Sequence, residues 1–262
     1  MNTNRKDLKA VTKKQSVSFS LGFIVLTTLL QTVLSVLPGY LYYQDNPQGP
    51  MILPYMLVYL LLCDFFQVFT RALYKKGRSL SLAIYAIKIL ASGALIYFVA
   101  SQTAYQFVLI FIAYEIFQLL ILSKHFFYID SIMYSITNAI FKGLVFNQLL
   151  TISYPFNYDF KAMIPFIFAF FLILFITILT QGMYSFLSKQ AWFLLLSVVC
   201  LITIYYLLYM QFSNSILPLW KFTSFIVANI IALFFFAKSK NSQKKELVLY
   251  LFGLVGLMVY YF

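Results

Sequence analysis

Nine apolar stretches, each about as long as a membrane-spanning helix, follow one another along this chain with short polar gaps between them. A helix rises about 1.5 Å per residue, so about 20 apolar residues are needed to cross a bilayer core. We place the spans at residues 17–43, 51–70, 79–99, 103–123, 126–152, 161–187, 191–210, 217–237 and 246–262. The sequence therefore predicts an all-α polytopic membrane protein, a bundle of about nine transmembrane helices within residues 17–262.

The composition agrees with this class. Of the 262 residues, 63% are hydrophobic and only 10% are charged, whereas about 25% charged residues is usual for a soluble domain. Too few residues remain outside the spans for a second, soluble domain. The first span is too long for a cleaved signal peptide, and no small-x-small cleavage site follows it before Gln44. We interpret residues 1–16 as a basic leader in the cytoplasm.

The basic residues lie almost entirely in alternate gaps. They precede the first span and follow the second, fourth, sixth and eighth spans, and the opposite gaps contain Lys161 alone. Loops rich in Lys and Arg stay in the cytoplasm, so the pattern predicts a protein of the cell membrane with its N-terminus inside and its C-terminus outside. The net charge of +12 then serves orientation and contact with anionic lipid headgroups, and it does not indicate a nucleic-acid partner.

Few motifs of known chemistry occur in the chain. Cys63 and Cys200 both lie inside predicted spans, far apart in sequence, and fit neither a disulfide framework nor a zinc site. We interpret both as small buried hydrophobic residues. The sequence has no Ser/His/Asp arrangement, glycine-rich phosphate loop, haem motif or zinc spacing. No metal site is predicted.

Six ionisable residues fall inside the predicted spans, where each costs about 2.5–3.5 kcal/mol at mid-depth unless it finds a partner or a cavity. They are Asp64, Lys88, Glu115, Asp130, Lys142 and Lys221. The three carboxylates lie within about two turns of the cytoplasmic ends of their helices. Lys88 lies near mid-depth, where either Asp64 or Glu115 is a possible partner. These groups either form structural ion pairs between helices or line a functional cavity, and the sequence does not decide between the two.

The cytoplasmic end of the second span has a polar face. Asp64, Gln67 and Arg71 are spaced i, i+3 and i+7, so they lie on one side of a helix. Lys75 and Arg78 continue the polar segment into the following gap. Alone, this stripe is equally typical of ordinary hydrogen bonding between helices.

A second polar stripe ends the sixth span, where Thr177, Gln181 and Ser185 are spaced i, i+4 and i+8. Lys124 and His125, the only histidine, lie between the fourth and fifth spans. If the cytoplasmic ends of the spans converge, these polar and basic side chains surround one opening above an apolar bundle. Such a basic opening suits a lipid with an anionic head and a long tail. The alternative is that the cations only orient the protein and touch bulk headgroups.

The layout resembles the UbiA superfamily of intramembrane prenyltransferases. That family has nine helices, a cytoplasmic N-terminus, and an Asn-Asp-x-x-Asp-x-x-x-Asp motif at the cytoplasmic end of helix two. The matching positions here are Cys63, Asp64, Gln67 and Arg71, and a basic loop that ends Lys76-Gly77-Arg78-Ser79 follows. The family's link between helices four and five corresponds to Lys124-His125, and its second Asp-rich motif to Thr177, Gln181 and Ser185. The resemblance implies a cytoplasmic-facing site for an isoprenoid.

Asp64 is the only acidic residue of the family's two motifs present here. In the family those carboxylates hold Mg²⁺, which bridges the prenyl diphosphate, and Mg²⁺ prefers several oxygen ligands that include carboxylates. With Gln67, Arg71 and Gln181 at these positions, we expect no cofactor and no Mg²⁺-dependent prenyl transfer.

Three functions therefore remain open. The first is a UbiA-like protein that binds an isoprenoid or other anionic lipid without the usual transferase activity. The second is an active but drifted prenyltransferase of lipid-quinone type synthesis, which would use Mg²⁺. The third is a non-enzymatic transporter, export or immunity subunit, which would have a membrane or ATPase partner.

Overall fold

The computed structural model describes residues 20–45, 52–75, 80–102, 106–122, 131–151, 160–184 and 191–262, and these residues form nine helical rods. The rods are α2 (Leu21–Asp45), α3 (Leu53–Lys75), α4 (Leu82–Gln102), α5 (Gln106–Leu122), α6 with η2 and α7 (Ile132–Ala139, Ile140–Val145, Phe146–Thr151), η3 with α8 (Phe160–Phe166, Ile167–Tyr184), α9 (Ala191–Ser213), α10 (Leu219–Lys238) and α11 (Ser242–Tyr261). Each predicted span overlaps one rod, although the ends differ by several residues, and the all-α prediction is confirmed.

Six of these rods are long and apolar enough to cross a membrane: α2, α3, α4, α8 with the end of η3, α9 and α10. Helix α5 is apolar but shorter. Large apolar side chains cover the outer surface, and only 11% of the apolar segment of α10 is buried within the bundle. An outer surface of this kind is stable against lipid but not against water. The chain is therefore an integral multi-pass membrane protein.

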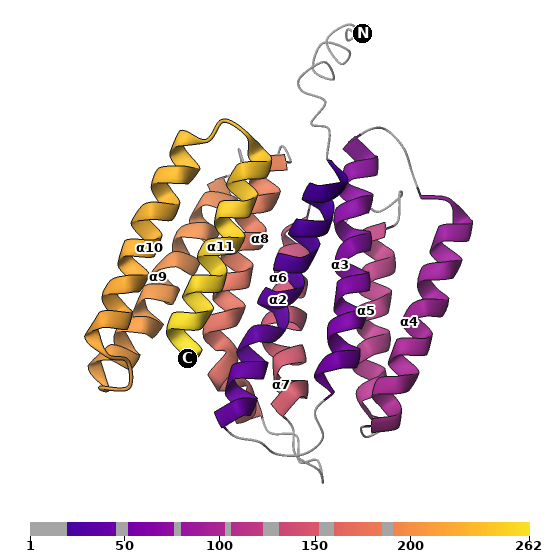
Figure 1. Cartoon of the computed structure of the whole chain (residues 1–262), viewed down its shortest axis with the longest axis horizontal. Helices are drawn as coiled ribbons and strands as arrows, with labels where there is room; N and C mark the ends of the chain where they lie inside the picture. Colours follow the sequence, from indigo (N-terminus) through magenta and orange to yellow (C-terminus); the bar gives the residue numbers. More distant parts are fainter. Residues whose placement is uncertain are drawn as a thin grey trace, which may run out of the picture.

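The rods stand side by side, with α2, α6, α7 and α8 in the middle of the view in Figure 1. Helix α3 packs on α2, α4 and α5, whereas α9 packs on α8 and α10 packs on α11. Helix α11 returns to contact both α2 and α8, so the first and last described helices are neighbours. The middle of the bundle is consequently built from helices of the first, central and last parts of the chain, namely α2, α3, α6, α8 and α11.

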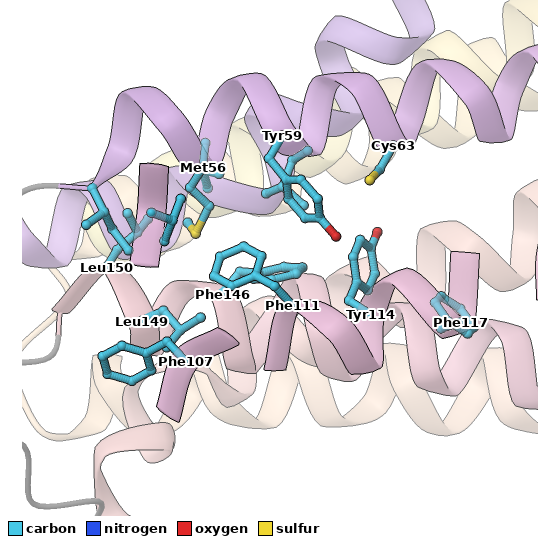
Figure 2. Close-up of a cluster of buried hydrophobic side chains, with 14 of the residues drawn as sticks. Met56, Tyr59, Cys63, Phe107, Phe111, Tyr114, Phe117, Phe146, Leu149 and Leu150 are labelled. Atoms are coloured by element: carbon cyan, nitrogen blue, oxygen red, sulfur yellow. The ribbon is translucent and has the colours of Figure 1, made fainter. Parts of the chain in front are cut away.

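One hydrophobic core lies between α3, α5 and α7. Met56 and Tyr59 from α3 meet Phe111 and Tyr114 from α5, and Phe146 from α7 packs between them (Figure 2). The rings of Tyr59 and Phe111 meet edge to face with centroids 5.1 Å apart. Aromatic pairs prefer this geometry because the positive ring edge faces the negative ring face. The core fixes α5 against the rest of the bundle.

The fifth predicted span, 126–152, is not one regular helix. Residues Ile140–Val145 form a π-helical turn between α6 and α7, which the apolar pattern did not predict. Asn147 compensates for this irregularity, because its Nδ2 donates to the carbonyl oxygens of Lys142 (2.7 Å) and Gly143 (3.2 Å). Its Oδ1 accepts from the backbone N–H of Gly39 (2.7 Å), which follows Pro38 inside α2. One buried amide therefore supports irregular backbone in two helices.

The π-helical turn also packs unusually close to α8. A Cβ atom added at Gly143 would lie 2.5 Å from the Cα of Phe170 and 2.9 Å from its backbone nitrogen. Small residues allow the backbones of neighbouring membrane helices to approach each other in this way. Glycine at position 143 thus sets the distance between the π-helical turn and α8.

The orientation in the membrane is a prediction from the charge pattern. Reporter fusions placed after Asn46, Lys76, Asn157 and Asn241 are expected to report outside, inside, outside and inside, respectively. Alkaline phosphatase and green fluorescent protein give complementary readouts. A cytoplasmic signal at Asn157 would contradict the scheme, since it requires one span fewer or one more before that position.

Candidate functional site

Asp64 forms a buried ion pair in the middle of the bundle. The Lys142 ammonium donates to its Oδ1, and the hydroxyl of Thr32 donates to its Oδ2 at 2.9 Å. The three side chains come from α3, η2 and α2, and each is at most 1% exposed. Because the carboxylate is fully enclosed, its charge is balanced by Lys142 rather than by solvent. Lys142 was not predicted as the partner of Asp64.

A second ion pair joins α4 to α5. The Lys88 ammonium donates to Glu115 Oε1, and Glu115 Oε2 accepts from the hydroxyl of Tyr59 at 3.2 Å. Glu115 is one of the two partners that the sequence offered for Lys88. Figure 2 shows the hydroxyls of Tyr59 and Tyr114 pointing toward each other, on the side of the aromatic core that faces Cys63. This pair therefore borders the apolar core and lies between different helices from the Asp64 pair.

The two predicted polar stripes meet on neighbouring residues of α6. Gln67 Oε1 accepts from the hydroxyl of Tyr134 (3.3 Å) and from Gln31 Nε2 on α2 (3.5 Å). The hydroxyl of Ser135 donates to Gln181 Oε1. Gln67 and Gln181 are each at most 4% exposed. The stripes on α3 and α8 are thus joined through α6, and amides occupy the positions at which the resembling family has carboxylates.

Arg71 forms a third ion pair, one turn beyond Gln67 on α3. Its Nη1 lies 3.2 Å from Oε1 of Glu246 on α11, and its guanidinium lies 5.7 Å from the ring centroid of Tyr184 on α8. The hydroxyl of Tyr250 donates to the same Glu246 oxygen (3.4 Å). The Arg71 side chain is 12% exposed and that of Glu246 only 1%. This ion pair connects α3, α8 and α11 at one end of the bundle.

Sequence reasoning missed Glu246, although it is one of only seven acidic residues in the chain. It directly follows Lys244 and Lys245 and is the first residue of the last predicted span. The signal in the sequence that could have identified Glu246 was a carboxylate directly after a basic gap. The partner of Glu246 could not be read from the sequence, because Arg71 is 175 residues away.

A small cavity of about 20 Å³ lies between the Asp64 and Arg71 ion pairs. Its polar lining comes from Gln31, Ser35, Asn138, Lys142, Thr177 and Tyr250, and its apolar wall from Leu34, Ile173 and Ile176. Among the described residues, Gln31 Oε1 and Asn138 Oδ1 have no hydrogen-bond partner. A space of this size holds about one water molecule. The cavity therefore favours a small hydrogen-bond donor and is too small for a diphosphate.

Several predicted site residues lie outside the described part of the chain. They are Arg78, Lys124, His125 and Asp130, together with the side chain of Lys75 and with Ser185. Within the described ranges, no three residues of the types His, Cys, Asp and Glu lie close enough to hold a metal ion together. Cys63 and Cys200 are both free and buried, as predicted.

Comparisons with protein-family models, with curated proteins and with solved structures find no match to this chain.

Proposed function

We propose that this membrane protein binds an isoprenoid or other anionic lipid at its predicted cytoplasmic end, in a UbiA-like arrangement without Mg²⁺-dependent prenyl transfer. The observation that favours this function is the placement of Arg71. The side chains of the paired cations Lys88 and Lys142 are at most 1% exposed, whereas the Arg71 side chain keeps 12% of its surface exposed at the end of the bundle. Arg71 is thus a cation that is paired with a carboxylate inside the bundle and that a ligand can still reach.

The chemistry of arginine supports a phosphate-bearing ligand. A guanidinium has five N–H donors in a planar fork, and Glu246 engages Nη1. The remaining donors suit a phosphate oxygen pair, and lysine offers no such fork. Glu246 places a negative charge beside this position, so it opposes the binding of an anion. The tail of the ligand would lie among the apolar side chains of the spans.

The neutral polar centre of the bundle argues against transfer chemistry of the family's usual kind. Gln67 and Gln181 hydrogen-bond to α6, and Asp64 is engaged by Lys142 and Thr32. For Asp64 to hold a Mg²⁺ ion that binds a prenyl diphosphate, its ion pair with Lys142 would have to break. The competing drifted-enzyme function requires Mg²⁺-dependent turnover that is lost in Asp64→Asn.

Two substitutions with opposite expected effects test the proposal. Arg71→Lys keeps the charge but removes the fork, and we expect retention of farnesyl phosphate to fall about tenfold, the value of a charge-assisted hydrogen bond. Glu246→Gln keeps the side-chain shape and removes the opposing charge, so retention is expected to rise. Native mass spectrometry of the purified protein measures the bound fraction.

The matched control is Lys244→Gln, which removes a cation from an exposed position on α11. It should leave retention of farnesyl phosphate nearly unchanged. Thermal unfolding in the same detergent checks that all three variants are folded. If folded Arg71→Lys retains farnesyl phosphate as well as Lys244→Gln does, the cations serve only to orient the protein and the proposed function is wrong.

A further inference from the structure

A lateral groove of about 400 Å³ lies between α8, α9, α10 and α11. Its lining comes from Phe175, Ile178, Leu179, Gly182 and Met183 on α8, Phe193, Leu194, Ser197, Val198 and Leu201 on α9, Phe236 on α10 and Lys245 on α11. In Figure 1 these helices form the orange and yellow side of the bundle, and the connection between α10 and α11 lies at the same end of the bundle as the start of α2. Neither Arg71 nor Glu246 lines the groove, although Lys245 directly precedes Glu246 in the chain.

The walls of the groove suit a hydrocarbon chain. Ser197 is polar, but its hydroxyl donates to the carbonyl oxygen of Phe193 (2.8 Å), so it offers no unused donor. The other wall residues on α8 and α9 are apolar. Helices α9 and α10 are mostly exposed along their apolar segments, with 22% and 11% buried. The groove thus faces the hydrocarbon region of the bilayer, and its volume lies in the usual range for small-molecule sites, about 300–1,000 Å³.

Lys245 supplies the only charge among the described residues that line the groove. Its ammonium lies 4.7 Å from the ring centroid of Phe236 on α10, and it forms no ion pair within the described part of the chain. The adjacent Glu246 is directed to Arg71 instead. A cation without a carboxylate, at one end of an apolar groove, is complementary to a lipid with an anionic head.

We propose that this groove binds one anionic phospholipid of the bilayer, with an acyl chain along α8 and α9 and its phosphate at Lys245. The phospholipid is favoured over other anions because the groove opens sideways to the membrane. Lys245 lies at the predicted cytoplasmic surface, where anionic lipids attract basic residues. The site is independent of the lipid site proposed at Arg71. Lys245 would then bind a lipid phosphate in addition to orienting the protein in the membrane.

Lys244 and Lys245 provide a matched pair of variants. They are adjacent and carry the same charge, but Lys244 is exposed and Lys245 is half-buried in the groove. The protein would be extracted from vesicles of mixed phosphatidylglycerol and phosphatidylcholine, and retained lipid counted by native mass spectrometry. We expect Lys245→Gln to lower retention of phosphatidylglycerol about fivefold and Lys244→Gln to change it little. Equal losses in the two variants would overturn the proposal.

A second variant tests the groove without changing the charge. Ser197→Phe places a ring in the groove and leaves Lys245 in position, so retention of phosphatidylglycerol should fall at least as far as in Lys245→Gln. Unchanged retention in this variant would show that the chain lies elsewhere and would also overturn the proposal. Preferential retention of undecaprenyl phosphate over phosphatidylglycerol, sensitive to Ser197→Phe, would overturn the choice of lipid. The part of phosphatidylglycerol retention that Ser197→Phe removes should persist in Arg71→Lys, which separates this proposal from the proposed function.

Discussion

Lys142→Met is expected to lower the free energy of unfolding by about 3–5 kcal/mol, because it leaves the Asp64 carboxylate enclosed and without a counter-charge. Asp64 is completely buried, and after the substitution only the hydroxyl of Thr32 would still donate to it. Methionine fills a similar volume, so the lost charge rather than a cavity causes the effect. Unfolding by sodium dodecyl sulfate in mixed micelles, followed by circular dichroism, measures the change.

The double variant Asp64→Asn with Lys142→Met isolates the electrostatic part. Asparagine keeps an acceptor for Thr32 and removes the unpaired charge, so the double variant should regain most of the lost stability. The exposed Lys244→Met is the control for loss of a lysine, and it should change stability by at most about 0.5 kcal/mol. If the double variant is as unstable as Lys142→Met, the pair does not determine the stability of this region.

Gly143→Ala is expected to lower the free energy of unfolding by about 3 kcal/mol, the upper end for overpacking of a close contact. The new methyl group would lie 2.5 Å from the Cα of Phe170, which is backbone and cannot rotate away. The π-helical turn and α8 must therefore separate, and the hydrogen bonds from Asn147 to this turn would lengthen.

The matched control is Gly93→Ala in the middle of α4, where no atom lies within 4 Å of the added Cβ. Alanine is the better helix former there, so this variant should be neutral or about 0.5–1 kcal/mol more stable. The same detergent unfolding measures both variants. Equal stability of Gly143→Ala and Gly93→Ala would show that the contact with Phe170 is looser than the structure has it.

The fold was predictable from the sequence to the level of the helices. Apolar runs of membrane length depend on local composition alone, and each of the nine predicted spans overlaps a described helical rod. The π-helical turn at Ile140–Val145 was not predictable, because it lies inside a continuous predicted span and the apolar pattern does not distinguish it from a regular helix. Its hydrogen bonds to Asn147 and the approach of α8 at Gly143 are tertiary features, which a linear pattern does not contain.

The candidate site was predictable only in part, for a related reason. Helical spacing gave the shared face of Asp64, Gln67 and Arg71, because it depends only on residues of one helix. Pairing depends on which helices become neighbours. The sequence therefore offered Glu115 for Lys88, which lies on the next helix, but missed Glu246 as the partner of Arg71.

The three ion pairs can form only in a fixed order while the protein is being synthesised. Lys88 and Glu115 are 27 residues apart, Asp64 and Lys142 are 78 apart, and Arg71 and Glu246 are 175 apart. A chain made from its N-terminus supplies these partners in that order. Asp64 has no ion-pair partner until two further helices have been made, and Arg71 has none until α11 has been made. The last of the three ion pairs therefore forms only when α11 is present, so a factor that shields unpaired charges during insertion would be needed longest for Arg71.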